Sequence, residues 1–265
     1  MKYLKTVSFL CGSVLLFPAN ATILDQTTVN DPVLGSRTVV YEHINGFAVV
    51  EGDIIIGKVS ELQNQGAVIS SKVSGSRWQN GIVPFEMSED LPFRNKLAIL
   101  QAIDHWQSHS KIEFVELTSK NRYEYKDYVS FISAPGTTCS SFIGRQGGKQ
   151  VINLAPRCNT MNTVHELGHT LGLWHEQSRA DRNDYIRIVW ENIDEDHKHN
   201  FDQHLVEGKD FGEYDYQSIM HYGPYSFSKN GEKTIISLID GVEIGQRDHL
   251  SEKDIAAINA MYPEA

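Results

Sequence analysis

The stretch from His165 to His175 constrains the fold of this 265-residue chain more than any other part of it. It reads HELGHTLGLWH. On a helix, His165 and His169 are four residues apart and leave the same face. Gly172 permits a backbone turn that a Cβ would hinder. His175 can swing back toward the other two histidines only if the helix ends there. The string therefore predicts a helix over about residues 161–172, followed at once by a turn of the chain.

Three imidazoles gathered in this way are suited to bind one metal ion. Their nitrogens can meet a metal at about 2.0–2.1 Å, and a set of three histidines leaves a position open for water. Zinc is the expected metal because the chemistry of such a site needs no redox control. Glu166 lies beside His165 and projects to the side, so it can reach a water at the metal without binding the metal itself. The spacing therefore predicts a zinc site with a carboxylate base.

A second motif, SIMHY, runs from Ser218 to Tyr222, about 45 residues after His175. Met220 can form an apolar base beneath a metal site, although a single methionine more often belongs to an ordinary core. Tyr222 taken alone likewise fits a packed tyrosine. The long histidine string followed by a methionine turn is the signature of the metzincins.

Beyond these motifs, the chain resembles the astacin family of metzincins over about residues 78–262. Glu176, directly after His175, separates this family from other metzincins. The run HEQSRADR resembles the family's HE-x-x-R-x-D-R pattern, and SIMHY matches its methionine turn. Residues 139–158 and 245–255 resemble two further blocks of the family. The resemblance implies a secreted, bacterial-like zinc endopeptidase that is made as an inactive precursor.

The resemblance also implies roles for individual residues. It implies that the zinc ligands are His165, His169 and His175. It also implies that Glu166 is the catalytic base and that Tyr222 is a fifth, detachable metal ligand. A phenol is acidic enough to approach a metal and can also donate to an oxyanion, so Tyr222 would move from zinc to the transition state. Met220, Glu176 and Gly172 take structural roles.

Periodicity along the chain predicts an α+β domain, with strands followed by helices. Apolar residues at helical spacing predict a helix over residues 95–108, and a capping box at Ser251 and Asp254 opens a final helix. Short apolar or alternating runs predict strands at residues 82–85, 112–115, 128–132, 141–143 and 150–154. Pro84 suggests that the first of these is an edge strand or ends there.

The metzincin fold implied by the resemblance has two halves. The upper half holds a twisted, mostly parallel small sheet with an antiparallel edge strand and two long helices. The lower half, after Gly172, is irregular and ends in a C-terminal helix. An extended substrate could pair with an exposed edge strand near residues 140–144.

Residues 1–21 have the pattern of a signal peptide, with two lysines, an apolar stretch and an A-x-A cleavage site. Its removal leaves Cys139 and Cys158, and an even pair in an exported chain suggests a disulfide. Two buried free thiols are the alternative. The astacin family usually has a second disulfide in this domain, for which this chain has no cysteines. Lys111 and Pro263 fall near where that pair would sit, which puts the rigidity of the C-terminus in doubt.

Residues 22–70 lack a long helical period and could not build a core alone. They form either a small N-terminal subdomain or a propeptide. Gly52 and Asp53 match the end of the F-x-G-D motif of astacin propeptides, in which the aspartate binds zinc and blocks it. Val50 stands where the phenylalanine is expected. An exposed turn is the alternative interpretation of these two residues.

The resemblance divides the chain into a signal peptide over residues 1–21, a propeptide over 22–70 and a catalytic domain over 71–265. The mature chain is expected to begin between about residues 66 and 73. Its freed ammonium could then reach Glu176 and form a buried charge pair.

The formal net charge of −10 argues against a nucleic-acid partner. No stretch after the signal peptide is apolar enough to span a bilayer. We expect protein or peptide substrates, the chain's own propeptide as inhibitor, and a monomer. A catalytically silent zinc-containing binding or adhesion module is the alternative from another class, and a non-peptidase zinc hydrolase is a further one. The intact Glu166 favours an enzyme over a silent module.

Overall fold

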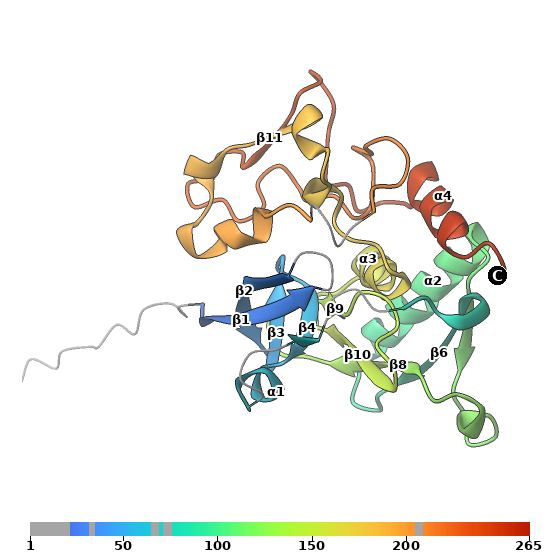
Figure 1. Cartoon of the computed structure of the whole chain (residues 1–265). Helices are drawn as coiled ribbons and strands as arrows, with labels where there is room; N and C mark the ends of the chain where they lie inside the picture. Colours follow the sequence, from blue (N-terminus) through green and yellow to red (C-terminus); the bar gives the residue numbers. More distant parts are fainter. Residues whose placement is uncertain (1–21, 32–34, 65–68, 71–75, 205–208) are drawn as a thin grey trace, which may run out of the picture.

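The computed structural model describes residues 22–31, 35–64, 69–70, 76–204 and 209–265. The predicted signal peptide, residues 1–21, lies outside this part, as does most of the stretch in which the mature chain is expected to begin. Three regions are distinguished below: the N-terminal segment (residues 22–70), the sheet half (76–172) and the irregular half (173–265). In Figure 1 the irregular half, coloured gold to red, forms a layer beside the sheet, with helix α3 between them.

The sheet half contributes five strands in the spatial order β9-β10-β8-β6-β7. These strands are β6 (Ile82–Met87), β7 (Glu113–Glu116), β8 (Tyr128–Ser133), β9 (Ser140–Ser141) and β10 (Lys149–Leu154). Four of them are parallel, and β9 is antiparallel to β10. The predicted mostly parallel sheet with one antiparallel strand is confirmed.

Strand β6 does not lie at an edge of the sheet, contrary to the expectation from Pro84. It pairs with β7 along Ile82–Phe85 and with β8 only along Phe85–Met87. Pro84 therefore lies on the stretch of β6 that has a partner on one side only. A proline nitrogen, which cannot donate, is tolerated there.

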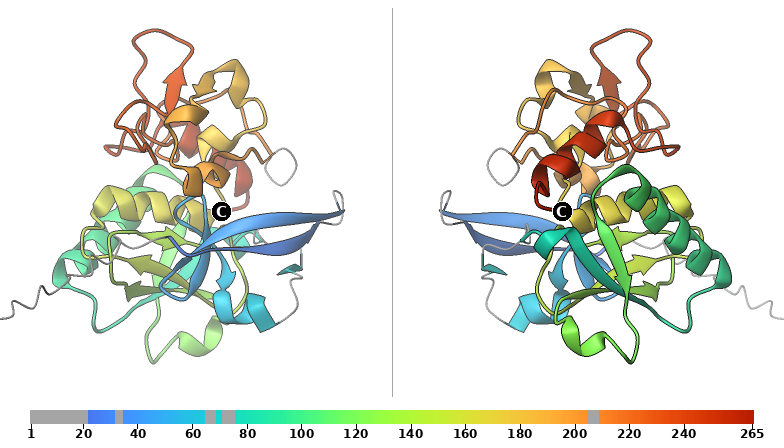
Figure 2. Two further views of the ribbon diagram at one scale, coloured as in Figure 1. Left: turned by 90° about the vertical axis from the view of Figure 1, so that its left-hand side faces the viewer. Right: turned by 90° about the vertical axis from the view of Figure 1, so that its right-hand side faces the viewer.

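The N-terminal segment extends this sheet to ten strands. Its elements are β1 (Leu24–Asp31), β2 (Gly35–Ile44), β3 (Phe47–Val50), β4 (Ile54–Lys58), helix α1 (Val59–Asn64) and β5 (Ile69–Ser70). β1 to β4 form an antiparallel meander, and the β1–β2 hairpin projects sideways from the molecule (Figure 2). β4 pairs in parallel with β9 through Ile54 and Ser141, so β9 has a neighbour on both sides.

The core of the N-terminal segment includes residues from outside it. Tyr41, Val50 and Ile54 are buried in one cluster with Ile143 of the sheet half, and Trp174 of the irregular half packs against that cluster. This shared burial agrees with the expectation that residues 22–70 could not build a core alone.

Two long helices pack beside the sheet, as expected. They are α2 (Phe93–His109) and α3 (Thr160–Leu171), and the main core lies between them and the strands. Trp106 of α2 is fully buried and its indole Nε1 donates to the carbonyl of Val164 at 2.9 Å, which fixes α2 against α3. α2 begins two residues before the predicted 95–108, directly after Pro92, which is its N-cap residue.

Short elements and one helix make up the irregular half. They are 3-10 turns η3 (Glu176–Ser178), η4 (Arg182–Asp184), η5 (Trp190–Asn192) and η6 (Glu195–Phe201), strands β11 (Ile186–Ile188) and β12 (Ile235–Ser237), and helix α4 (Glu252–Met261). Two further 3-10 turns, η1 (Gln79–Gly81) and η2 (Arg122–Glu124), lie in the sheet half. Among the described residues, no helix has the length and apolar character that crossing a bilayer requires.

The C-terminal helix α4 is tied down at both ends. Ser251 and Asp254 form the predicted capping box at its start. Past its end, the Lys111 ammonium donates to the carbonyl of Pro263 at 3.3 Å. Lys111 and Pro263 fall near where the resemblance places the second disulfide of the family, and here a hydrogen bond connects them.

Candidate metal centre

Helix α3 ends where the histidine string predicts. Asn159 caps its first turn in a capping box with Asn162. At its end Gly172 has φ +115°, in the left-handed region, and its N–H donates to the carbonyls of Gly168 and His169. A Cβ on Gly172 would lie 2.6 Å from Cε of Met261. Only glycine fits this turn, which returns the chain toward the helix and brings His175 back beside the other histidines.

Four side chains converge on one point: Asp53, His165, His169 and His175. Their ligand atoms all lie within 4.8 Å of one another. The Asp53 carboxylate is 3.2 Å from Nε2 of His165, 3.5 Å from that of His169 and 3.2 Å from that of His175. The carboxylate of the N-terminal segment therefore occupies the open position of the three-histidine set.

The outer nitrogens of the three rings fix their orientation. Nδ1 of His165 donates to the carbonyl of Ile219, and Nδ1 of His169 donates to that of Leu173, both at 2.8 Å. Nδ1 of His175 donates to the carboxylate of Glu51, also at 2.8 Å. In the neutral form of each ring the proton is on Nδ1, so Nε2 would present a lone pair to the common point, as in metal-binding histidines.

The donor set fits zinc. Nε2 of His169 and Oδ1 of Asp53 are buried without a hydrogen-bond partner among the described residues, and a metal ion would satisfy both. Burial lowers the pKa of His165 to about 3, so this ring is neutral at physiological pH. Burial opposes the charged form of His175 as well, but Asp53 and Glu51 raise its pKa to about 9. A metal must therefore displace a proton from His175.

Glu166 follows His165 on α3 and does not belong to the four-residue group. Its side chain is buried, and Oε2 has no hydrogen-bond partner among the described residues. Burial, together with the nearby charge of Asp53, raises its pKa well above the usual range of a glutamate. A buried carboxyl that readily holds a proton and lies next to the metal-binding residues is suited to general acid–base catalysis.

Tyr222 does not join the metal group while the N-terminal segment is in place. Its ring lies against His175, with ring centroids 4.7 Å apart, and its hydroxyl donates to the backbone carbonyl of Glu51 at 2.5 Å. The Tyr222 hydroxyl is thus bound to the backbone of the N-terminal segment, and not to the group of Asp53 and the three histidines. Met220, beneath the site, is buried, and a Cβ on Gly168 of α3 would lie 2.7 Å from its sulfur.

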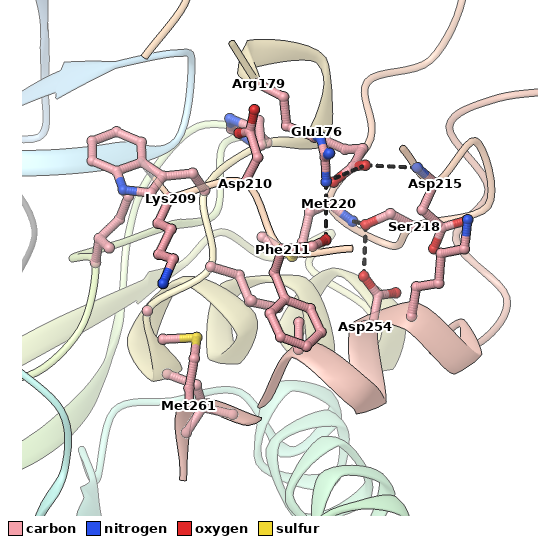
Figure 3. A pocket seen from close by; sticks show the side chains of 18 of the residues that line it. Glu176, Arg179, Lys209, Asp210, Phe211, Asp215, Ser218, Met220, Asp254 and Met261 are labelled. Atoms are coloured by element: carbon pink, nitrogen blue, oxygen red, sulfur yellow. Dashed lines mark hydrogen bonds and ion pairs between the residues drawn. The ribbon is translucent and has the colours of Figure 1, made fainter. Parts of the chain in front are cut away.

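Glu176 lies beside a cavity of about 420 Å³ between the turn after α3 and helix α4. Figure 3 shows its carboxylate between Arg179 and Asp215. It accepts from the backbone N–H of Asp215 at 2.7 Å, and the Arg179 guanidinium is 3.6 Å away. Burial raises the pKa of Glu176 to about 8, although Arg179 and this hydrogen bond oppose the shift. The site could therefore accommodate a further cationic group.

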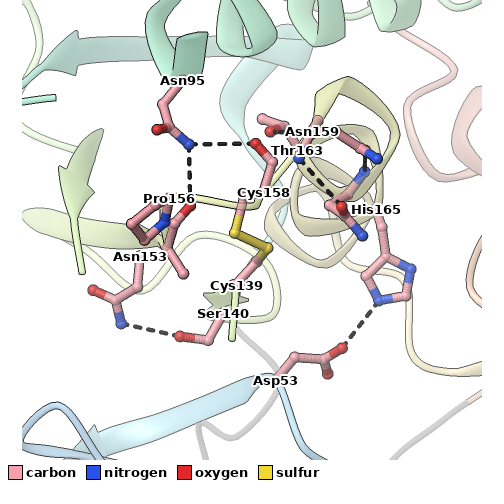
Figure 4. The surroundings of a disulfide bond; sticks show 12 residues. Asp53, Asn95, Cys139, Ser140, Asn153, Pro156, Cys158, Asn159, Thr163 and His165 are labelled. Atoms are coloured by element: carbon pink, nitrogen blue, oxygen red, sulfur yellow. Dashed lines mark hydrogen bonds and ion pairs between the residues drawn. A yellow bond between two sulfur atoms is a disulfide. The ribbon is translucent and has the colours of Figure 1, made fainter. Parts of the chain in front are cut away.

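Cys139 and Cys158 form a disulfide, so the alternative of two free thiols is wrong. The bond connects the residue before β9 to the loop that precedes α3 (Figure 4). Asn95 of α2, fully buried, donates to the carbonyl of Cys158 at 3.3 Å. The disulfide thus connects β9 to the loop that leads into the histidine helix α3.

Sequence reasoning missed Glu51, Ser178 and His204. The Glu51 carboxylate is shared by His175, Ser178 and His204, and it is 4 % exposed. Burial alone would raise the pKa of Glu51, but His204 and His175 beside it lower the pKa below its usual value. Glu51 is the unspecified residue of the F-x-G-D pattern, so the motif itself gave no reason to select it.

Comparison with known proteins agrees with this geometry. The profile of the astacin peptidase family matches residues 70–263. The chain is 36 % identical over 224 residues to zinc metalloproteinase nas-4 of Caenorhabditis elegans, covering 80 % of this chain and 68 % of the relative. It is 41 % identical over 192 residues to nas-6 of the same organism, covering 70 % and 53 %. It is 34 % identical over 223 residues to human meprin A subunit beta, covering 82 % and 30 %.

Among solved structures, high choriolytic enzyme 1, a hatching-enzyme zinc protease of the medaka Oryzias latipes, matches with a TM-score of 0.64 and 34 % identity. The match covers 73 % of this chain and 96 % of that one. Against the three full-length relatives above, the matched region spans from 30 % to 68 % of their length. Fold, histidine set and sequence agree, and the chain belongs to the astacin family of zinc metallopeptidases.

Proposed function

We propose that this protein is a secreted zinc endopeptidase that is synthesised as a zymogen, with residues 71–265 as its catalytic domain and residues 22–70 as its propeptide. The observation that carries the proposal is the set of three imidazoles whose Nδ1 atoms are all engaged, leaving three Nε2 atoms facing one point. His165, His169 and His175 would hold the zinc ion. The disulfide supports an oxidising compartment.

Two side chains of the catalytic domain would carry the proton and charge transfers. Zinc, when bound, supplies Lewis-acid activation of water and of the scissile carbonyl. Glu166 accepts the proton of the attacking water and delivers it to the leaving amine, a role that suits a buried carboxyl with an oxygen unpaired among the described residues. Tyr222 becomes free to donate its hydroxyl to the developing oxyanion when the carbonyl of Glu51 leaves.

The N-terminal segment would keep this machinery silent by occupying the cleft. Asp53 takes the open position of the histidine set, and β4 pairs with β9 at Ser141, near where an extended substrate is expected to pair. The N–H of Ser141 donates to the carbonyl of Asp53 at 2.9 Å. The propeptide therefore excludes a substrate from both the metal position and the adjacent strand.

Activation would require cleavage between about residues 66 and 73. The freed ammonium then enters the cavity beside Glu176 and pairs with its carboxylate. Burial disfavours the ionised form of Glu176 and raises its pKa, so a cation beside the carboxylate would stabilise that form.

Casein cleavage by the processed enzyme, with and without a chelator, tests this function. We expect chelation to abolish cleavage and zinc to restore it. Glu166→Gln should be inactive, whereas the matched control Glu113→Gln, at an exposed position on β7, should cleave like wild type. Full activity in Glu166→Gln or in the presence of chelator would reject the proposal. A folded, zinc-loaded enzyme without activity would instead favour the binding module.

The propeptide role has its own test in the unprocessed precursor. Asp53→Ala should raise zinc-dependent peptide hydrolysis above the level of the wild-type precursor, while Asp240→Ala, in an exposed turn, should not. If Asp53→Ala is as silent as wild type and binds zinc no differently, Asp53 is not the residue that maintains latency.

A further inference from the structure

Both polar groups of the Tyr222 backbone are bound by side chains of the irregular half. The N–H of Tyr222 donates at 2.9 Å to Oε1 of Gln177, which is fully buried in η3. The carbonyl of Tyr222 accepts from Nδ1 of His221 at 2.7 Å. Tyr222 lies outside any helix or strand, so these two hydrogen bonds take the place of a regular backbone ladder in fixing its peptide groups.

His221 is itself held by contacts with three other parts of the irregular half. Its ring is fully buried, and Nε2 lies 2.7 Å from the hydroxyl of Tyr214. The ring of Tyr214 stacks on that of Tyr185, with centroids 4.7 Å apart. Nη1 of Arg247 donates to the carbonyl of His221 at 3.0 Å. A buried imidazole with both nitrogens hydrogen-bonded would lose a partner in any other orientation, so it holds the Tyr222 carbonyl in one place.

The peptide bond that follows Tyr222 is also closely packed. Gly245, in the loop before α4, has φ +77° and lies directly against this bond. A Cβ on Gly245 would lie 2.8 Å from the carbonyl carbon of Tyr222 and 2.5 Å from the nitrogen of Gly223. The approach on this side is close enough to require glycine, so the backbone of residues 222–223 cannot shift toward Gly245.

The hydroxyl end of Tyr222 is held differently. It donates to the carbonyl of Glu51, which belongs to the N-terminal segment, and the ring lies against Phe201 and Phe227. Removal of the N-terminal segment as proposed would free the hydroxyl. The backbone contacts would remain, because their partners all lie in the irregular half. The phenol could then turn about the bonds of its own side chain while the backbone stays fixed.

We propose that Gln177 and His221 are positioning residues of the hydrolysis, which fix the backbone of Tyr222 so that its phenol, once released from Glu51, reaches the developing oxyanion. Tyr214 supports His221 in this role. The inference rests on the proposed endopeptidase function. The hydroxyl is at the far end of a long side chain, so a small rotation of the backbone displaces it by much more. A displacement of about 1 Å can lower the rate of an enzyme about 10²-fold.

A double-mutant cycle in the processed enzyme tests this role. His221→Leu removes the donor to the Tyr222 carbonyl and should lower kcat by about 10–100-fold with little change in KM, at most the loss expected without the phenol. With Tyr222→Phe already present, the same change should lower kcat by less than about twofold, because no phenol is left to position. The control His109→Leu, at an exposed position on α2, should keep the wild-type kcat.

Two further variants examine the hydrogen bonds one at a time. His221→Asn, whose side-chain amide can donate from about the place of Nδ1, should recover most of the wild-type kcat. Gln177→Leu removes the acceptor of the Tyr222 N–H and should repeat the result of His221→Leu, again with no effect once Tyr222→Phe is present. If His221→Leu does not fold, Tyr214→Phe removes only the hydroxyl beside Nε2 and should lower kcat about fivefold in the same cycle.

Equal losses with and without the phenol would overturn the inference, because His221 would then support the site by a route other than Tyr222. A wild-type kcat in His221→Leu, or in Tyr214→Phe where that variant replaces it, would overturn it as well. Each of these results leaves an active wild-type enzyme and therefore the proposed function intact. A wild-type enzyme that cuts no peptide rejects the proposed function and this inference together.

Discussion

Breaking the Cys139–Cys158 disulfide should destabilise the precursor by an amount that the loop length sets. The two cysteines are 19 residues apart in the sequence. In the loop-entropy model, a closed loop of this size contributes about 3 kcal/mol to the free energy of unfolding. For a chain of this size, each kcal/mol shifts Tm by about 2–4 °C, so the expected loss is about 6–12 °C. The variant to compare with wild type is Cys139→Ser with Cys158→Ala.

Differential scanning calorimetry of the purified precursor measures this loss. Cys158 is 3 % exposed, so removing its sulfur leaves a small void that adds a little to the loss. Wild type under reducing conditions, with the thiols still in place, separates the cross-link from the void. A decrease in Tm of less than about 3 °C in both samples would refute the reasoning, because the unfolded chain would then gain little conformational freedom when the bond is broken.

Three further perturbations follow from the site. Tyr222→Phe in the processed enzyme should lower kcat by about 10²–10³ with little change in KM, and a change confined to KM would remove its role at the oxyanion. Because burial raises the pKa of Glu176 to about 8, this group stabilises the precursor at pH below about 4.5, and the contribution is lost as pH rises through 8. Thermal unfolding of Glu176→Gln should therefore show a flatter fall in Tm between pH 5 and 9, and an unchanged slope would contradict this. Gly52→Ala places a Cβ 2.7 Å from Cζ of Phe227 and should raise peptide hydrolysis by the precursor. Gly46→Ala, at a similar φ but with open space around it, should not. Equal hydrolysis by the two variants would show that the fit of Gly52 against Phe227 does not maintain latency.

The sequence was sufficient to predict the histidine helix and its end. His165 and His169 fall at helical spacing, and Gly172 provides the left-handed residue with which many helices end. These features are local, since each depends on residues within a few positions of one another. The same holds for the capping box of Ser251 and Asp254. Local rules could therefore place both helices to within a few residues.

The contacts of Glu51 with Ser178 and His204 could not be predicted, because the three residues come from distant places in the chain. These residues have no spacing rule in common, and Glu51 reaches the other two only because the N-terminal segment packs against the irregular half. The pairing of β4 with β9 is likewise a property of two packed segments. Sequence periodicity indicated that Ser141 lies in a strand but could not indicate which strand would pair with it.

The brevity of β9 has a consequence for how the active enzyme behaves at high concentration. If residues 22–70 are removed as we propose, β4 no longer pairs with β9 through Ile54 and Ser141, and the outer backbone groups of β9 meet solvent. A long bare strand of this kind recruits further copies of a chain into fibrous aggregates. β9 is only two residues long, Ser140 and Ser141, and both side chains are hydroxylic. In the proposed mature enzyme this edge would be long enough to hydrogen-bond an extended peptide and too short to nucleate self-association.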